Sequence, residues 1–221
     1  MRAGRLIVAA MVATAALAGC TLVKNEERDS GTQSGVDVFF EDENFNPDKM
    51  AADLWDSQVI PYLADKAGSL EEILPLMAED PEAAGARFGH REQAEAPWTV
   101  ATRVEGTIVA AKTDTRAATI DIDVDGDAAA DAQVQIGPVV RGTALRDILD
   151  FVPFGSFTNQ IDYAQFGKSL NRLMSDAELA DVPREDLVGR TVELLGVFPL
   201  DDSQAPPIIT VAEISVGEKA P

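Results

Sequence analysis

The sequence has very few of the side chains on which metal sites and nucleophilic catalysis depend. Its 221 residues include one cysteine, Cys20, and one histidine, His90. A lone histidine without cysteine partners does not supply the usual ligand set of a zinc site. A serine triad would also need His90, but no serine stands in a Gly-x-Ser-x-Gly context. With a single cysteine no disulfide can form within the chain, so the hydrophobic core must stabilise the fold.

Positive charge is also scarce. The chain has 18 lysines and arginines against 38 aspartates and glutamates, which gives a formal net charge of −20. Such a chain repels phosphate backbones, so the sequence argues against nucleic-acid binding. It has no glycine-rich phosphate loop, and its carboxylates are so abundant that no pair stands out as a catalytic couple. We therefore predict that the protein is not an enzyme and uses no cofactor.

The longest apolar run lies near the N-terminus and is too short to span a bilayer, which requires about 20 residues. Arg2 and Arg5 precede an apolar segment at residues 6–16, and small residues follow, as in a bacterial secretory signal. The stretch Leu17-Ala18-Gly19-Cys20 resembles the lipobox of bacterial lipoproteins. This resemblance implies cleavage of residues 1–19, a diacylglycerol group on the Cys20 thiol, and acylation of the new amino terminus. The alternative is an ordinary secreted protein with a spare cysteine in its signal.

Residues 20–44 are polar and show neither helical nor strand periodicity, which is typical of a flexible tether. Together with the signal and the lipobox, they predict a protein anchored by lipid on the periplasmic side of the cell envelope. The sequence leaves open whether the inner or the outer membrane receives the lipid. Because residues 1–19 hold two arginines and no acid, their removal changes the formal charge to −22.

Residues 45–95 have helical signals and predict a small helical subdomain. Asn46 and Pro47 suit the start of a helix. Apolar residues then recur at helical spacing, although Pro61 should end or kink this helix. Ser69 and Glu72 form a capping box for a second helix. The apolar positions of the first helix are Met50, Leu54, Trp55, Val59 and Leu63.

Residues 96–217 have mostly the period of two that is typical of strands. Strand patterns begin at Trp98, Thr119 and Gln133, with a glycine at 106 where the first strand can bend. A helical pattern follows at 160–174, and then strands at 191–198 and 207–216. Three strands, a helix and two strands are the order of the OB-fold. The predicted fold class is therefore α+β, a helical subdomain followed by an OB-like five-stranded barrel with a helix between strands 3 and 4.

An acidic loop follows the second strand of the predicted barrel. Asp121, Asp123, Asp125 and Gly126 match the first half of an EF-hand loop, but Ala132 stands where the closing glutamate belongs. We favour a β-hairpin whose aspartates face water while its isoleucines face the core. The alternative is a weak calcium contact formed by Asp123, Asp125, Asp127 and Asp131.

Polar residues also lie in the apolar segment between the third strand and the helix. They are Arg141, Arg146, Asp147, Asn159 and Gln160. Buried polar groups need partners, so we favour an arginine–aspartate pair with amide hydrogen bonds that locks this crossover over the barrel. The alternative is a polar pocket in which the two arginines bind a carboxylate.

The chain also resembles a family of predicted periplasmic lipoproteins of unknown function, often encoded beside sugar ABC transporters. The likeness rests on the lipobox, on Phe45-Asn46-Pro47 with Trp55 and Val59-Ile60-Pro61, and on the motif from Ile136 to Asp147 with Phe157-Thr158-Asn159-Gln160. It implies a helical subdomain, an OB-like barrel and transporter components as partners, and it brings no catalytic residues.

The resulting hypothesis is a non-catalytic, lipid-anchored accessory or binding protein associated with carbohydrate import. The alternative is a structural envelope module that holds another protein and binds no small ligand.

Mass spectrometry of the native protein tests the anchor. We expect a polypeptide that begins at Cys20 and carries the added mass of a diacylglycerol thioether and an acyl chain. An unmodified sulfur or an uncut leader would contradict the predicted anchor and, with it, the predicted location.

Overall fold

The computed structural model describes residues 45–200 and 206–219. The predicted signal peptide, Cys20 and the tether at 20–44 lie outside these residues. The strands are β1 (Gly68–Ser69), β2 (Gly89–His90), β3 (Thr99–Lys112), β4 (Ala117–Asp123), β5 (Ala132–Pro138), β6 (Arg190–Pro199) and β7 (Ile208–Lys219). The helices are α1 (Pro47–Leu54), the π-helical turn η1 (Trp55–Val59), α2 (Ile60–Lys66), α3 (Leu70–Glu79), α4 (Pro81–Phe88), α5 (Ala144–Asp147), the 3₁₀ turn η2 (Phe154–Ser156) and α6 (Gln160–Ala177).

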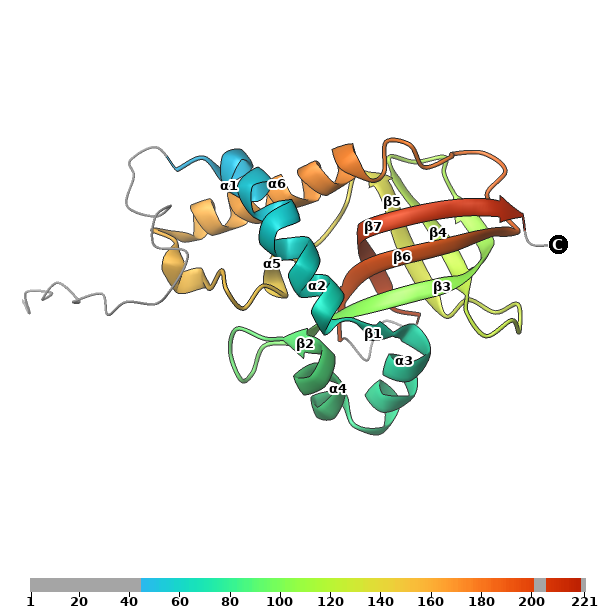
Figure 1. The fold of residues 1–221 in the computed structure, drawn as a ribbon, viewed down its shortest axis with the longest axis horizontal. Helices are drawn as coiled ribbons and strands as arrows, with labels where there is room; N and C mark the ends of the chain where they lie inside the picture. Colours follow the sequence, from blue (N-terminus) through green and yellow to red (C-terminus); the bar gives the residue numbers. More distant parts are fainter. Residues whose placement is uncertain (1–44, 201–205, 220–221) are drawn as a thin grey trace, which may run out of the picture. The chain divides into compact units, whose positions relative to one another are not determined.

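Five of the strands close into a barrel (Figure 1). The strand β3 pairs with β4, β4 with β5, β5 with β7, β7 with β6, and β6 with β3 again. All of these pairs are antiparallel except β5–β7, which is parallel. Helix α6 lies between β5 and β6 in the chain, that is, between the third and fourth barrel strands. This is the OB-fold arrangement, so the predicted fold class is confirmed.

The strand β3 joins the two sides of the barrel because it changes partner along its length. Its first part pairs with β6 from Thr99 to Thr107, and its last part pairs with β4 from Thr107 onward. Beside this change lies Gly106, where a Cβ atom would come within 2.4 Å of the Asp123 carbonyl oxygen and 2.7 Å of Ile122 Cγ2. At Gly106, where the sequence predicted a bend, β4 approaches the β3 backbone so closely that no side chain fits at this position.

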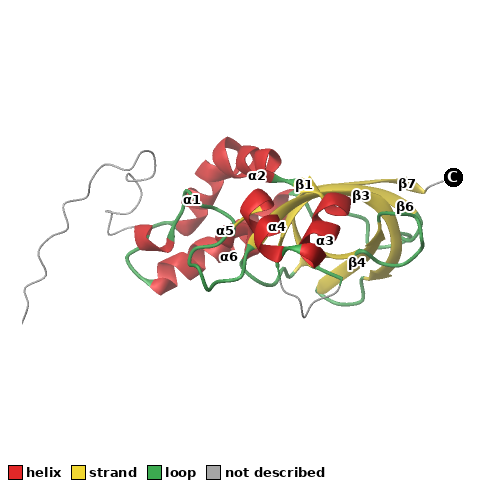
Figure 2. Cartoon of the chain, turned by 90° about the horizontal axis from the view of Figure 1, so that it is seen from below, coloured by secondary structure: helices red, strands yellow, loops and turns green. Residues whose placement is uncertain are grey.

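The helices lie beyond one end of the barrel and along one side of it. Helices α1 and α6 lie side by side, while α3 and α4 lie near β1, β2 and the start of β3 (Figures 1 and 2). The five apolar residues predicted for the first helix are all buried, and they share one hydrophobic core with barrel residues such as Ile120 and Phe198. The domain boundary predicted at residues 95 and 96 falls in the loop before β3 and stays a prediction.

The first helix, predicted to end or kink at Pro61, does not end there. Its regular hydrogen bonding is interrupted just before Pro61 by the π-helical turn, in which the Ile60 amide donates to the carbonyl oxygen of Trp55. Pro61 then occupies the first turn of α2, where its missing N–H group is tolerated. Ser69 caps helix α3 as predicted, since its hydroxyl accepts a hydrogen bond from the Glu72 amide at 3.2 Å, while the Glu72 carboxylate pairs with Arg87.

Replacing Gly106 by alanine tests the close approach of β3 and β4. We expect the free energy of unfolding to fall by about 1–3 kcal/mol, because the added methyl group meets backbone that cannot move without separating the two strands. Chemical denaturation of the purified protein measures this change. In the matched control Gly155→Ala, the new Cβ would meet no atom within 4 Å. The control should change stability by less than about 0.5 kcal/mol, and equal stability of the two variants would contradict the proposed contact.

Candidate functional site

A cavity of about 620 Å³ lies where the barrel meets the loop before β3 and the segment that follows β5. Strands β4, β5 and β7 form its floor, and the loop at 91–97 and the segment at 141–147 form its walls. Of the residues singled out in the sequence, Arg141, Arg146 and Asp147 line it. Three of its lining residues are both polar and buried, namely Thr99, Gln135 and Thr210. The cavity is thus partly apolar and partly polar, which is typical of small-molecule sites.

The loop that carries Arg141 is fixed by side chains from several elements. The Gly137 carbonyl oxygen accepts a hydrogen bond from Arg184 Nη1 at 2.7 Å, and the Pro138 carbonyl oxygen accepts one from the Ser175 hydroxyl at 3.3 Å. The Val139 amide donates to the carbonyl oxygen of Arg116 at 2.8 Å. Further along, the Gly142 carbonyl oxygen accepts from Asn171 Nδ2 at 2.9 Å. This loop therefore has one defined conformation, because its backbone groups are paired one after another.

The buried side chain of Gln135 holds the backbone of Arg141 from both sides. Its Oε1 accepts a hydrogen bond from the Arg141 amide at 2.8 Å, and its Nε2 donates to the Arg141 carbonyl oxygen at 3.1 Å. The same Nε2 donates to Thr210 Oγ1 on β7 at 3.0 Å. The Arg141 side chain is exposed, and among the described residues no carboxylate forms a salt bridge with it. A hydrogen-bonded backbone thus presents a guanidinium that no described carboxylate pairs with and that is able to bind an anion.

The second arginine of the crossover is already paired. Arg146 Nε and Nη2 donate to Asp147 Oδ1 at 2.8 and 2.5 Å, and the guanidinium carbon lies 3.8 Å from the centre of the Tyr163 ring. The Thr143 hydroxyl donates to the other carboxylate oxygen of Asp147 at 2.5 Å. Burial raises the pKa of the Tyr163 phenol, while the Arg146 charge opposes this shift. These groups form a wall of fixed shape in which the phenol stays neutral near physiological pH.

Asn159 and Gln160 do not line the cavity. The Asn159 side chain caps helix α6 by accepting hydrogen bonds from the amides of Ile161 and Asp162 at 2.8 and 3.0 Å. Its Nδ2 donates to Asp162 Oδ2 at 2.9 Å, and Gln160 is exposed in the first turn of the helix. The polar cluster of the sequence is therefore divided into a cavity part and a helix cap.

The acidic hairpin between β4 and β5 departs from its predicted form at Asp123. This side chain is 7% exposed rather than facing water, and its two oxygens accept hydrogen bonds from the amides of Gly126 at 2.7 Å and Ala128 at 2.9 Å. Asp131 Oδ2 likewise accepts from the Val124 amide at 2.8 Å. The aspartates fold the loop by binding its own backbone amides, and this requirement overrides simple strand alternation.

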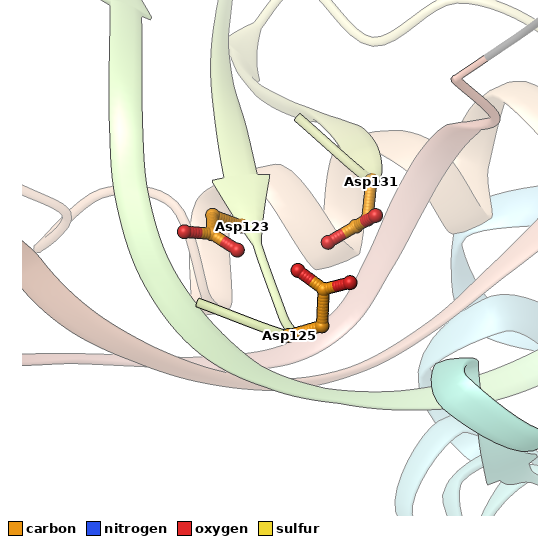
Figure 3. Close-up of side chains that lie close together, drawn as sticks. All are labelled: Asp123, Asp125 and Asp131. Carbon is orange, nitrogen blue, oxygen red and sulfur yellow. The ribbon is translucent and has the colours of Figure 1, made fainter. Parts of the chain in front are cut away.

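Three of the four aspartates named for calcium come close together. Oxygen atoms of Asp123, Asp125 and Asp131 lie within 4.8 Å of one another, and Figure 3 shows the carboxylates of Asp125 and Asp131 facing each other. Asp127 is not part of this group. Asp123 and Asp131 already accept backbone hydrogen bonds, so these bonds explain the positions of the carboxylates without an ion.

Several cavity residues were not foreseen from the sequence. Gln133 and Gln135 alternate with apolar residues in β5, which predicts two solvent-facing amides. Gln135 is instead buried, because the backbone of Arg141 folds back over it. Arg91 and Tyr163 reach the cavity from a loop and from α6, and no local sequence signal marks either of them.

The fold and the cavity define an OB-fold protein with a helical cover and a polar site on the barrel. A solved OB-fold protein from Thermotoga maritima has a similar structure, with a TM-score of 0.62 and 17% sequence identity, and the match covers 79% of this chain and 99% of the other. No curated protein matches the sequence.

The sequence matches the family model described as predicted periplasmic lipoprotein (DUF2291) over residues 10–215. The chain belongs to this family, so it is a periplasmic lipoprotein, held by lipid on the periplasmic side of the envelope. In the described part of the chain, no helix combines the length and the apolar content needed to cross a membrane.

Replacing Asp123 by alanine tests whether the aspartates fold the hairpin. We expect a loss of about 1–3 kcal/mol in the free energy of unfolding, because two loop amides lose their acceptors in a buried position. Asp127→Ala is the matched control. It removes one exposed hydrogen bond, to the Ala129 amide, and should have an effect of at most about 0.5 kcal/mol. If calcium raises the midpoint of unfolding, and if this rise is absent in Asp125→Ala, the hairpin instead binds the ion.

Proposed function

We propose that this lipoprotein is a non-catalytic accessory or binding protein that serves carbohydrate import on the periplasmic side of the envelope. The observation that carries the proposal is the cavity, in which a hydrogen-bonded loop presents Arg141 beside buried polar residues, and no carboxylate of the described residues forms a salt bridge with it. Such a cavity, of the size of many small-molecule sites, supports ligand binding on this face of the barrel. The link to carbohydrate import rests on the resemblance to lipoproteins encoded beside sugar transporters.

The arrangement of the cavity also supports a role without catalysis. A carboxylate acts as a general base only where it is free to accept a proton from the reacting group. Asp147 is engaged by Arg146 and by the Thr143 hydroxyl, so both of its oxygens already accept hydrogen bonds. Glu92, the second carboxylate among the described lining residues, accepts a hydrogen bond from the Phe154 amide at 3.2 Å. Both acids therefore support the walls of the cavity.

The alternative function is a structural envelope module that uses the same face to hold another protein. The pairing of Arg146 with Asp147 favours it in part, because this pair stabilises the crossover whether or not a ligand binds. Under this alternative Arg141 belongs to a protein contact, and no small molecule occupies the cavity.

Affinity isolation and sugar binding with the full-length lipoprotein in detergent test the proposal. We expect the protein to bind sugars and to co-isolate transporter components from its own cells, and Arg141→Glu to reduce both at least about tenfold by reversing the charge in the cavity. Arg87→Glu is the control, since Arg87 lies on α4 outside the cavity and pairs with Glu72. If the protein neither binds sugars nor co-isolates transporter components, the import role is contradicted. A stable Arg141→Glu variant that loses only a protein partner would favour the structural module.

A further inference from the structure

A second cavity of about 510 Å³ adjoins the first and shares four lining residues with it. Arg141 lies on the boundary and lines both. The second cavity adds Lys112 and Arg116 and no described acidic residue. We call the two joined cavities the basic groove.

The charge of the basic groove is opposite to that of the chain. Five cations line it, namely Arg91, Lys112, Arg116, Arg141 and Arg146, whereas Glu92 and Asp147 are its acidic residues among those described. The whole chain has a formal net charge of −20. Positive charge gathered in a hollow of an otherwise acidic protein raises the local concentration of anions and repels cations.

The cations of the groove are not equally available. Arg91 pairs with Glu82 at 2.8 Å and stacks over Trp98, and Arg146 pairs with Asp147 at 2.5 Å. Arg141 has no such pair among the described residues, and its backbone is held by the nine-tenths-buried Gln135. A guanidinium on a fixed backbone loses less entropy on binding than one on a mobile loop, and its planar fork matches carboxylate and phosphate oxygens.

The remaining surface of the groove suits the body of a small polar molecule. Phe154 and Tyr163 pack edge to face at one wall, with ring centres 5.3 Å apart. Thr119 and Gln133 line the part common to both cavities. Arg146 covers one face of Tyr163, so it is the exposed Phe154 ring that can cover the apolar side of a sugar ring, while hydroxyl and amide groups meet its hydroxyls.

We propose that the basic groove binds a small anionic sugar, with its carboxylate or phosphate group on the Arg141 guanidinium and its ring toward Phe154 and Tyr163. This inference rests on the proposed function and narrows its ligand from carbohydrates in general to those with an anionic group.

Calorimetric titration of the full-length lipoprotein in a neutral detergent tests the inference with three probes of one ring structure: glucose, glucuronate and glucose 6-phosphate. We expect at least one anionic probe to bind about tenfold or more tightly than glucose, which corresponds to about 1.4 kcal/mol. Preference for glucuronate identifies a carboxylate ligand, and preference for glucose 6-phosphate identifies a phosphate ligand. Arg141→Met should remove the preference, and Arg141→Lys should retain only part of it, because lysine cannot bind two oxygens in a fixed plane.

The control Arg87→Met removes the same charge from α4, outside the groove, and should leave the preference unchanged. Thermal unfolding of each variant checks that it folds, and the exposed position of Arg141 favours folded variants. If glucose binds as tightly as both anionic probes, or if Arg141→Met keeps the preference, the inference is wrong while carbohydrate binding stands. If none of the probes binds but transporter components still co-isolate, the inference is also wrong and the import role stands without a sugar site.

Discussion

The structure depends on the pairing of β3 with two different partners. Because one strand bonds to β6 along its first part and to β4 along its last part, the sheet closes without free edges in the barrel. Closure matters in a chain with one cysteine, which cannot form a disulfide within itself. Barrel closure also brings β5 beside β7 in the parallel pair that forms the floor of the cavity.

The floor in turn fixes the loop on which the site depends. Gln135 on β5 and Thr210 on β7 lie next to each other because their strands pair in register. Their hydrogen bond orients the Gln135 amide toward the backbone of Arg141. The register of β5 and β7 thus positions the buried Gln135 amide, and this amide positions the backbone that carries the exposed Arg141 guanidinium. The geometry of the site therefore depends on barrel closure as much as on the arginine itself.

Charge has two separate roles in this protein. The excess of acids gives the chain a formal net charge of −20, and the aspartates of the β4–β5 hairpin fold their own loop. The few arginines act in more specific ways. Arg103, on β3, donates to the carbonyl oxygens of Ala64 and Ala67 at the end of α2 and so ties the helices to the barrel. Arg184 and Arg146 support the crossover, which leaves Arg141 available in the groove.

Local sequence patterns were sufficient for the main elements of this fold. Periodicity located the five barrel strands and α6, the capping residues Asn46 and Ser69 marked two helix starts, and the order of elements gave the OB-fold topology. The two-residue strands β1 and β2 and the short helix α5 were not predicted. These features depend on residues that are neighbours in sequence, so a single chain without alignment reveals them. The exceptions, Pro61 and Asp123, are places where a helix or a hairpin adjusted to a local backbone requirement.

The sequence by itself determined the cellular location of the protein, its fold class and its core, because signal patterns and hydrophobic periodicity are local properties. Only the tertiary structure decided that Arg141 has no salt bridge within residues 45–200 and 206–219, that Arg146 is paired and that Asn159 is a helix cap. It also decided that Gln135 is buried under a loop and that Lys112 and Arg116 join the same groove. The physical reason is that availability and burial depend on partners brought from distant parts of the chain, as when Gln135 meets Thr210.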